Sequence, residues 1–272
     1  MKSWTEPFRR RELTVVAIPY RDVALRPMEG ANSVLLTALP YFFPTEEGQN
    51  LARFAALPDY HGYFGRLLQE ICEELREAFP QHFFRPFTDN SPLDERKAAL
   101  LGGLAAKGKN NLCTTDKGSF VFLGEIVTDG DFSLRITPPT MNCENCNACL
   151  RACPNGALTE EGFRYERCLA YITQKKGDLT EEEQTALRNH RMAWGCDRCA
   201  EACPHNRNLP TATIALPPNT RLPRLSSEEI QDLSDRKYRE RYADRAFAWR
   251  GKATMLRNLK LLEESNHGKN EE

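Results

Sequence analysis

The fold of the middle of this chain is decided by one stretch, Cys143-Glu-Asn-Cys146-Asn-Ala-Cys149-Leu-Arg-Ala-Cys153-Pro154. Its spacing, Cys-x2-Cys-x2-Cys-x3-Cys-Pro, is typical of sequences that bind two [4Fe–4S] clusters. In such sequences three closely spaced cysteines bind one cluster, and the cysteine before the proline binds the other. A four-iron cube needs one soft thiolate on each iron, so a second set of cysteines must exist elsewhere in the chain.

That second set follows about forty residues later. The run Cys196-x2-Cys199-x3-Cys203-Pro204 has the same pattern with one cysteine missing, and the isolated Cys168 is the natural replacement. The crossed pairing rule then assigns the first cluster to Cys143, Cys146, Cys149 and Cys203. It assigns the second cluster to Cys153, Cys168, Cys196 and Cys199.

Structural zinc and disulfide bonds are the two alternatives for these cysteines. Zinc sites use paired Cys-x2-Cys knuckles, often with histidine, and do not require a third cysteine followed by Cys-Pro. Disulfide frameworks are typical of small secreted chains. We therefore predict two [4Fe–4S] clusters. Of the two remaining cysteines, Cys72 is expected to be a buried small hydrophobe on a helix, and Cys113 has no assigned role.

Composition limits the class of protein. The chain has 272 residues and a net charge of −1, which argues against uniform electrostatic attraction to nucleic acid. Its amino terminus lacks the apolar core of a signal peptide, and no stretch approaches the length of a membrane span. Reduced thiols and oxygen-sensitive clusters favour a cytoplasmic location.

The remaining sequence predicts mixed helices and strands. Strands are expected at 14–18, 33–39, 82–87 and 119–127, and helices at 59–79 and around Ala98 to Leu100. We predict an α/β fold, with α+β as the alternative. The expected domains are a catalytic body at 1–139, a double-cluster ferredoxin-like module at 140–210, and a helical segment with a polar tail at 211–272.

Three features of the catalytic body permit a chemical interpretation. Asp89 precedes Pro92 and a predicted helix, so position alone makes it a helix cap, with general acid as the alternative. The segment Asp59-Tyr-His61-Gly-Tyr-Phe64-Gly65 nearly matches Asp-x-His-x-x-Gly, by which a histidine ligates cobalamin cobalt, but Phe64 occupies the glycine position. Gly108-Lys109-Asn110 is either an anion-binding loop or a turn.

Together these segments resemble the epoxyqueuosine reductase family, cobalamin-dependent enzymes that complete queuosine in tRNA. The matching pieces are Ala52-Arg53-Phe54-Ala55, Asp59-Tyr60-His61, Asp89-x-x-Pro92-x-x-Glu95-Arg96, Gly108-Lys109-Asn110, Gly118-Ser119-x-x-Phe122-Leu123-Gly124-Glu125, the cysteine runs, and Ala248-Trp249-Arg250-Gly251. The resemblance spans about residues 30–260, and the Asp89 segment with the Leu-Gly-Glu strand makes it specific.

The resemblance implies an oxidoreductase with two [4Fe–4S] clusters and base-off cobalamin that reduces epoxyqueuosine to queuosine in tRNA. It implies Asp89 as the proton donor during ring opening, and electrons that pass through the clusters from an external low-potential donor. It further implies a set of residues around the cofactor: Ala55, Tyr60, Asp89, Lys109, Asn110, Ser119 and Gly124. The failed histidine motif agrees with cobalt that has no protein imidazole ligand.

The nature of the substrate is more open. Members of the family usually end in a helical-repeat domain that binds tRNA, and here only its beginning, near Met255–Leu259, is expected before a polar tail at 263–272. Residues 236–260 contain nine lysines or arginines against two acids, which suits either phosphate contacts or a solvated helix face. The alternatives are a corrinoid reductase of a small molecule, and an electron-transfer or cobalamin-carrier protein.

Overall fold

A four-stranded antiparallel sheet with the order β1-β2-β6-β3 organises the first part of the chain, in a computed structural model that describes residues 3–212 and 220–267. Its strands are β1 (Val15–Pro19), β2 (Ser33–Pro40), β6 (Val121–Thr128) and β3 (Phe84–Phe87). The register of the central pair places Leu36 of β2 opposite Glu125 of β6. Phe87 of β3 lies opposite the same glutamate on the other side.

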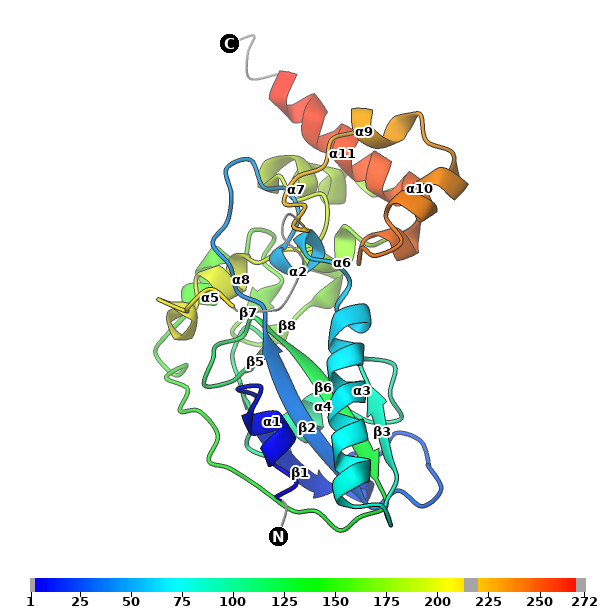
Figure 1. Cartoon of the computed structure of the whole chain (residues 1–272). Helices are drawn as coiled ribbons and strands as arrows, with labels where there is room; N and C mark the ends of the chain where they lie inside the picture. The colour runs from blue at the N-terminus through cyan, green and yellow to red at the C-terminus, as the bar shows by residue number, and fades with distance from the viewer. Residues whose placement is uncertain (1–2, 213–219, 268–272) are drawn as a thin grey trace. The chain divides into compact units, whose positions relative to one another are not determined.

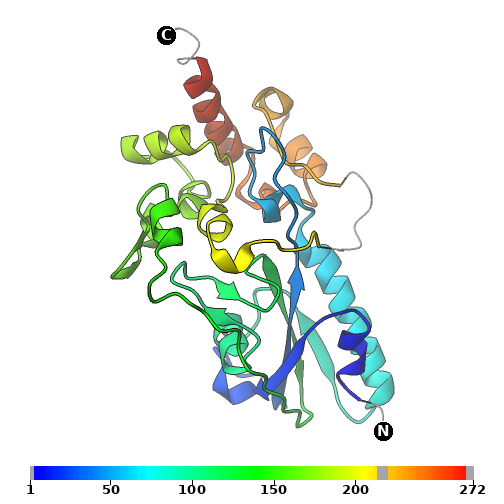
Figure 2. The same ribbon diagram turned by 90° about the vertical axis from the view of Figure 1, so that its left-hand side faces the viewer.

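One long and one short helix cover the two faces of this sheet. α3 (Tyr60–Ala78) packs against β3 and β6, and α4 (Glu95–Leu101) packs against β1, β2 and β6. Figures 1 and 2 show α3 lying alongside the strands. Burial on both faces explains why the strands are almost continuously apolar although they pair antiparallel. The mixed class is confirmed, and the antiparallel pairing gives it the α+β form.

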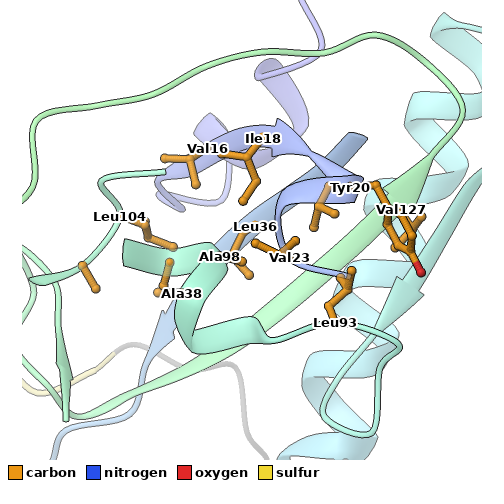
Figure 3. Packing of buried hydrophobic residues seen from close by; sticks show 13 residues of the cluster. Val16, Ile18, Tyr20, Val23, Leu36, Ala38, Leu93, Ala98, Leu104 and Val127 are labelled. Atoms are coloured by element: carbon orange, nitrogen blue, oxygen red, sulfur yellow. The ribbon is translucent and has the colours of Figure 1, made fainter. Parts of the chain in front are cut away.

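The core between the sheet and α4 is built from aliphatic side chains of four elements. Figure 3 shows Ile18 of β1, Leu36 and Ala38 of β2, Val127 of β6 and Ala98 of α4 pointing into this layer. Each fully buried side chain of valine or leucine size contributes about 1.5–3 kcal/mol relative to exposure. This layer therefore fixes α4, and with it the loop that precedes α4, onto the sheet.

The opposite face depends on a glycine. A Cβ atom at Gly124 of β6 would lie 2.6 Å from the ring of Phe64 and 2.8 Å from Leu68, both on α3. Only glycine therefore lets α3 approach this strand. The expected buried face of α3 is confirmed for Phe64, Leu68, Ile71 and Leu75, and Cys72 is fully buried among them as predicted. Burial raises the pKa of Cys72 to about 12.

The chain divides into two units. The first comprises Met1–Phe42, Tyr60–Asn145 and Asn208–Ile214, and the second comprises Phe43–Asp59, Cys146–Arg207 and Ala215–Glu272. The domain boundaries expected near residues 139 and 210 remain predictions. Besides the sheet, α3 and α4, the first unit contains α1 (Glu6–Arg9), the 3₁₀ turn η1 (Tyr20–Asp22) and the hairpin β4 (Ala106–Lys107) and β5 (Cys113–Thr114).

The second unit is built from short helices. They are α2 (Arg53–Ala56), α5 (Ala148–Ala152), α6 (Leu169–Ile172), α7 (Glu181–His190), α8 (Arg198–Glu201), α9 (Glu228–Gln231), α10 (Asp235–Arg241) and α11 (Lys252–His267). Smaller elements are β7 (Leu158–Thr159), β8 (Gly162–Phe163) and the 3₁₀ turns η2 (Tyr165–Arg167), η3 (Pro204–Asn206) and η4 (Ala248–Arg250). Leu169, Ile172, Leu187 and Leu261 form its apolar core.

The structure defines the ends of two helices. α4 begins at Glu95, three residues after Pro92, because Asp94 caps it by accepting a hydrogen bond from the Lys97 backbone N–H at 3.0 Å. The polar tail expected from residue 263 is helical as far as His267, as part of α11, and residues 268–272 lie outside the described part. No helix in the described ranges has both the length and the apolar character needed to span a bilayer.

Candidate functional site

Four cysteines from three separate segments meet in the second unit. Cys153 follows α5, Cys168 precedes α6, and Cys196 and Cys199 lie at the start of α8. Burial raises the pKa of Cys196 and Cys199 to about 12, and the neighbouring Cys153 and Cys168 contribute to both shifts. These are the four cysteines predicted for the second cluster. Because metals bind the thiolate, cluster assembly here must release protons.

Backbone N–H groups point at these sulfurs. The Ala157 N–H donates to Cys153 Sγ at 3.2 Å. Burial raises the pKa of Cys168, and the backbone N–H groups of Ala170 and Tyr171 oppose that shift by stabilising the thiolate. Such N–H···S bonds are one of the factors that set the reduction potential of a bound cluster.

The cysteines predicted for the first cluster are divided between the units. Cys143 lies in the first unit, whereas Cys146, Cys149 and Cys203 lie in the second. Cys149 and Cys203 are buried, and Cys149 is near enough to Cys199 to raise its pKa. Within the described ranges, no three Cys, His, Asp or Glu side chains converge on a single ion. A four-iron cube does not require this, because each thiolate binds a different iron.

A buried ion group supports the loop of the second cluster. Arg53 of α2 is 4% exposed and donates through Nη1 to Glu201 Oε1 at 2.9 Å. Its backbone N–H donates to Asp197 Oδ2 at 2.8 Å, and its Nε donates to the Phe43 carbonyl at 2.7 Å. Asp197 stands between Cys196 and Cys199 in the sequence, so Arg53 fixes the segment that carries both thiols. The sequence placed Arg53 in a motif but gave it no role.

A second polar contact ties α11 to the same segment. The fully buried Asn258 donates through Nδ2 to the carbonyls of Thr173 and Ala193, each at 2.8 Å. The Thr173 hydroxyl in turn accepts the Gly195 N–H at 3.0 Å. Gly195 has φ +72°, and a Cβ there would lie 2.6 Å from Ala52, so only glycine fits before Cys196.

Asp89 lies on the loop between β3 and α4 in an uncommon backbone conformation. Asp89 and Asn90 both have left-handed φ values, 59° and 49°, which asparagine and aspartate tolerate better than most residues. Asp89 Oδ1 accepts the Asn90 N–H at 2.7 Å, and Oδ2 lies 3.7 Å from His61 Nε2. The side chain is 52% exposed. The interpretation of Asp89 as a helix cap is wrong, because Asp94 has that role.

Two glutamates lie beside this loop, of which Glu95 is half-buried and Glu125 is fully buried. Glu95 is the first residue of α4, and burial, followed by the charges of Asp89 and Asp94, raises its pKa to about 7. Glu125 of β6 is fully buried, and burial raises its pKa to about 8, with Glu95 and Asp89 adding to the shift. Sequence reasoning included both glutamates in the motif without assigning them to the site. A charged residue inside the apolar strand 119–127 was the available signal.

Aromatic rings gather at the start of α3. The Tyr60 ring stacks on Phe122 with centroids 4.2 Å apart and planes at 4°, and Tyr41 stacks on Phe122 from 4.2 Å at 27°. Phe122 is buried beneath these rings, and the His61 ring lies 4.3 Å from that of Tyr60.

The loop between β4 and β5 carries two of the polar residues predicted near the cofactor, Lys109 and Asn110. Asn110 is buried and its Oδ1 accepts the Leu112 N–H at 3.2 Å, and Lys109 Nζ donates to the Glu144 carbonyl at 3.0 Å. The Thr114 hydroxyl at the end of this hairpin is buried and has no hydrogen-bond partner among the described residues. An orphaned hydroxyl and a buried amide fit a ligand with a polar edge, as the amide-bearing rim of a corrin has.

The other predicted cofactor residues differ in their surroundings. Ser119 is buried near the start of β6. The missing side chain of Gly124 is explained by the contact with α3, so a cofactor contact there remains a prediction. Ala55 is buried on α2 in the second unit.

The basic residues of segment 236–260 fall into two groups, one that makes internal hydrogen bonds and one that is exposed. Arg245, Lys252 and Arg257 donate to backbone carbonyls within the second unit, so their charges support the fold. In contrast, Arg236, Lys237 and Arg239 on α10 are exposed. Trp249 is 62% exposed, and the Arg250 guanidinium lies 3.6 Å from the centroid of its indole ring.

Comparisons with known families match the two parts of the chain. Residues 142–206 match a family described as a 4Fe-4S double cluster binding domain, which confirms the iron–sulfur assignment over zinc. Residues 23–90 match a family described as epoxyqueuosine reductase QueG, DUF1730. The chain is 32% identical over 271 residues to an epoxyqueuosine reductase of Gloeobacter violaceus, covering 93% of this chain and 79% of that protein.

Further relatives are longer than this chain. A Listeria monocytogenes epoxyqueuosine reductase is 34% identical over 207 residues, which are 75% of this chain and 54% of that protein. The fold matches a solved selenomethionine-labelled epoxyqueuosine reductase with TM-score 0.82 and 22% identity, covering 95% of this chain and 80% of that chain. It also matches an epoxyqueuosine reductase solved with an epoxyqueuosine-modified tRNA-Tyr stem loop, with TM-score 0.76 and 26% identity over 86% of this chain and 65% of that chain.

Proposed function

Because this chain belongs to the epoxyqueuosine reductase family, we propose that it reduces epoxyqueuosine to queuosine in tRNA. Epoxyqueuosine differs from queuosine by one epoxide oxygen. Removal of that oxygen as water consumes two electrons and two protons. The chain spans 54% of the length of the Listeria relative and 64% of the length of a Bacillus anthracis relative. Its activity and its substrate are therefore proposals.

The observation that carries the proposal is the presence, in one chain, of a proton source and an electron relay. The proton source is the acid group formed by Asp89, Glu95 and Glu125 around the start of α4. The electron relay is the double-cluster domain with its eight cysteines. An electron-transfer protein needs the relay and a cobalamin carrier needs the cofactor site, but neither has a use for this acid group.

Asp89 is the proposed proton donor. Its loop exposes the carboxyl while the hydrogen bond from Asn90 N–H and the nearby His61 fix its direction. An epoxide oxygen that opens without a proton becomes a strongly basic alkoxide, so an acid within hydrogen-bond reach contributes about 10²–10⁴-fold to the rate. Asp89 supplies that proton and becomes a carboxylate.

The proposed cofactor is base-off cobalamin, which when bound supplies a strong reductant at the epoxide carbon. In the first unit Tyr60, Lys109, Asn110, Ser119 and Gly124 would hold it. The orphaned Thr114 hydroxyl belongs to the same hairpin and is an additional hydrogen-bond donor for a corrin amide.

The proposed RNA contact uses the exposed part of the basic segment. Arg236, Lys237 and Arg239 on α10 would approach phosphates, and the exposed indole of Trp249 would stack on a base. The external electron donor would be a low-potential one-electron carrier. A cytoplasmic location belongs to this proposal, because reduced thiols and oxygen-sensitive clusters require it.

The test is anaerobic purification followed by an absorption spectrum and a nucleoside assay. The reduced protein with cobalamin is incubated with a stem loop that contains epoxyqueuosine, and digested nucleosides are separated. Formation of queuosine supports the proposal. Uptake and reduction of cobalamin without queuosine formation would instead favour the small-molecule reductase. Uptake of cobalamin that the protein does not reduce would favour the carrier.

A further inference from the structure

The carboxyl of Glu125 is buried without a partner in the centre of the sheet. It has no solvent exposure, and neither oxygen has a hydrogen-bond partner among the described residues. Side chains of a strand alternate between its two faces, so Glu125 lies on the same face of β6 as Leu123 and Val127. Those two pack in the layer beneath α4, and the Glu125 side chain therefore points toward that helix. The nearby Ser91 hydroxyl offsets only part of the cost of burial. A lone buried carboxyl is costly, so a native position for one needs a reason.

The surroundings of Glu125 are acidic. Asp89, Asp94 and Glu95 are each near enough to raise its pKa. Asp94 is engaged in capping α4. Like charges nearby disfavour the ionised form, so with burial they raise the pKa of Glu95 to about 7 and that of Glu125 to about 8.

The positive groups near this cluster are directed elsewhere. His61 of α3 faces Asp89, and Arg96 of α4 donates to Asn111 Oδ1 at 3.1 Å. Arg85 of β3 lies over the ring of Phe87, 5.4 Å from its centroid. Cys113 of β5 is an additional titratable group, and burial raises its pKa. None of these side chains forms an ion pair with Glu125 in the described structure.

We propose that Glu95 and Glu125 form a proton store that reprotonates Asp89 within a single turnover. This inference rests on the proposed function, because that reaction consumes two protons while Asp89 holds one. The first proton passes from Asp89 to the epoxide oxygen as the carbon–oxygen bond opens. The second passes from the store to the Asp89 carboxylate and then to the departing oxygen, which leaves as water. Two electrons arrive through the clusters from a low-potential one-electron donor, and solvent refills the store.

The loop geometry provides a route. Ser91 lies two residues after Asp89, and its hydroxyl is near enough to lower the pKa of Glu125 although it makes no hydrogen bond to the carboxyl in this structure. A hydroxyl both donates and accepts hydrogen bonds, so it can pass a proton between the two. Glu95 lies at the other side of the same loop, where Asp89 is the second largest influence on its pKa after burial.

Storage is tested first, without RNA. Infrared spectra of the holoprotein with ¹³C-labelled glutamate, taken between pH 5 and 10, report the C=O stretch of a protonated carboxyl. The parent protein is expected to keep this band at pH 7, and Glu125→Gln is expected to remove most of it. Glu77→Gln, at an exposed carboxyl on α3, is the matched control and should leave the band unchanged. A parent spectrum with no protonated glutamate at pH 7 would overturn the proposal.

Delivery is tested with RNA that contains epoxyqueuosine. We expect Glu125→Gln to bind both clusters and cobalamin but to lower single-turnover rates at least about tenfold at pH 8. The loss should be smaller at pH 6, where the higher proton concentration of the solvent replaces delivery from the store, and a merely structural role would not produce this difference. If Glu125→Gln fails to fold, Glu95→Gln is measured in its place. Equal rates for variant and parent at pH 8 would overturn the proposal. If the parent protein leaves the RNA unchanged, delivery is overturned together with the proposed function. The infrared band then reports separately whether the proton store exists.

Discussion

Arg53 and Asp197 form a buried contact in which the backbone N–H and Nη1 of the arginine approach the same carboxylate oxygen, at 2.8 and 3.3 Å. Asp197 lies between two predicted cluster ligands, so the pair joins α2 to the cluster loop. Removal of one partner leaves a buried charge without compensation.

We therefore expect Arg53→Met to lower the free energy of unfolding by about 3–5 kcal/mol and to reduce iron content. Urea unfolding of the holoprotein under anaerobic conditions measures the first, and iron analysis measures the second. Arg66→Met, at an exposed position of α3, is the control and should change stability by less than about 0.5 kcal/mol. A stable Arg53→Met protein with full iron content would contradict the role given to this pair.

Replacement of Cys168 by serine should remove one of the two clusters. The parent should contain about eight irons and the variant about four, because each cube has four irons and Cys168 is assigned to one of them. Iron and acid-labile sulfide assays measure both. Cys72→Ser is the comparison, since Cys72 is buried in the first unit beneath the sheet and should leave the iron content unchanged. Zinc in place of iron in the parent would disprove the assignment.

Asp89→Asn should lower turnover of epoxyqueuosine-containing RNA by at least about a hundredfold while clusters and cobalamin are retained. Asparagine keeps the shape and tolerates the left-handed conformation, but it cannot give a proton. Since Asp94 is the cap of α4, no loss of helix stability is expected, and thermal unfolding should match the parent. Asp131→Asn, at an exposed loop position, controls for the charge change. Normal turnover by Asp89→Asn would show that another group gives the proton.

Gly124→Ala should destabilise the first unit by about 1–3 kcal/mol, because the new Cβ would overlap Phe64 and Leu68. Gly65→Ala on α3 is the matched control. Its Cβ would meet only Thr88 at an ordinary 3.6 Å, so alanine in the helix should be neutral or stabilising by up to about 1 kcal/mol. Denaturant midpoints of the two variants measure the difference. A tolerated Gly124→Ala would mean that α3 can move away from β6.

The stability of the protein should fall as pH rises from about 4.5 to about 8. The folded state raises the pKa of Glu125 from 4.5 to about 8, so folding binds a proton that the unfolded chain releases in this range. Binding of this proton stabilises the folded protein relative to Glu125→Gln, whose side chain does not titrate. That stabilisation is complete below pH 4.5 and lost above pH 8. It amounts to about 3–5 kcal/mol at 1.4 kcal/mol for each pKa unit. Urea unfolding of both proteins at several pH values measures this, and parallel curves would contradict it.

The elements of the fold could largely be predicted because their patterns are local. The apolar runs of β1, β2 and β6 and the helical period of α3 depend on residues close in sequence. The spacing of the cysteines likewise predicted the ligand sets. Cys153, Cys168 and Cys196 are near enough to Cys199 to raise its pKa, as is Cys149, and the division into two sets stays a prediction.

The details of the acid group could not be predicted in the same way. Asp89, Ser91 and Asp94 are all acceptable helix caps, and only the packing of Ala98 and Ala99 against the sheet determines that the helix starts after Asp94. Glu125 meets Glu95 through strand register and helix packing, which join residues thirty positions apart. Similarly, the sequence counted nine basic residues in 236–260 but could not separate the internal Arg245 and Arg257 from the exposed ones.

The scattered origin of the ligand set predicted for the second cluster constrains the biogenesis of this protein. A nascent chain synthesised only as far as α7 contains Cys153 and Cys168 but lacks the thiols of Cys196 and Cys199. The machinery that delivers iron and sulfide must therefore act after translation has passed α8. Until then the early thiols have to be kept from oxidation, so the supply of reducing equivalents during synthesis should limit the yield of mature protein.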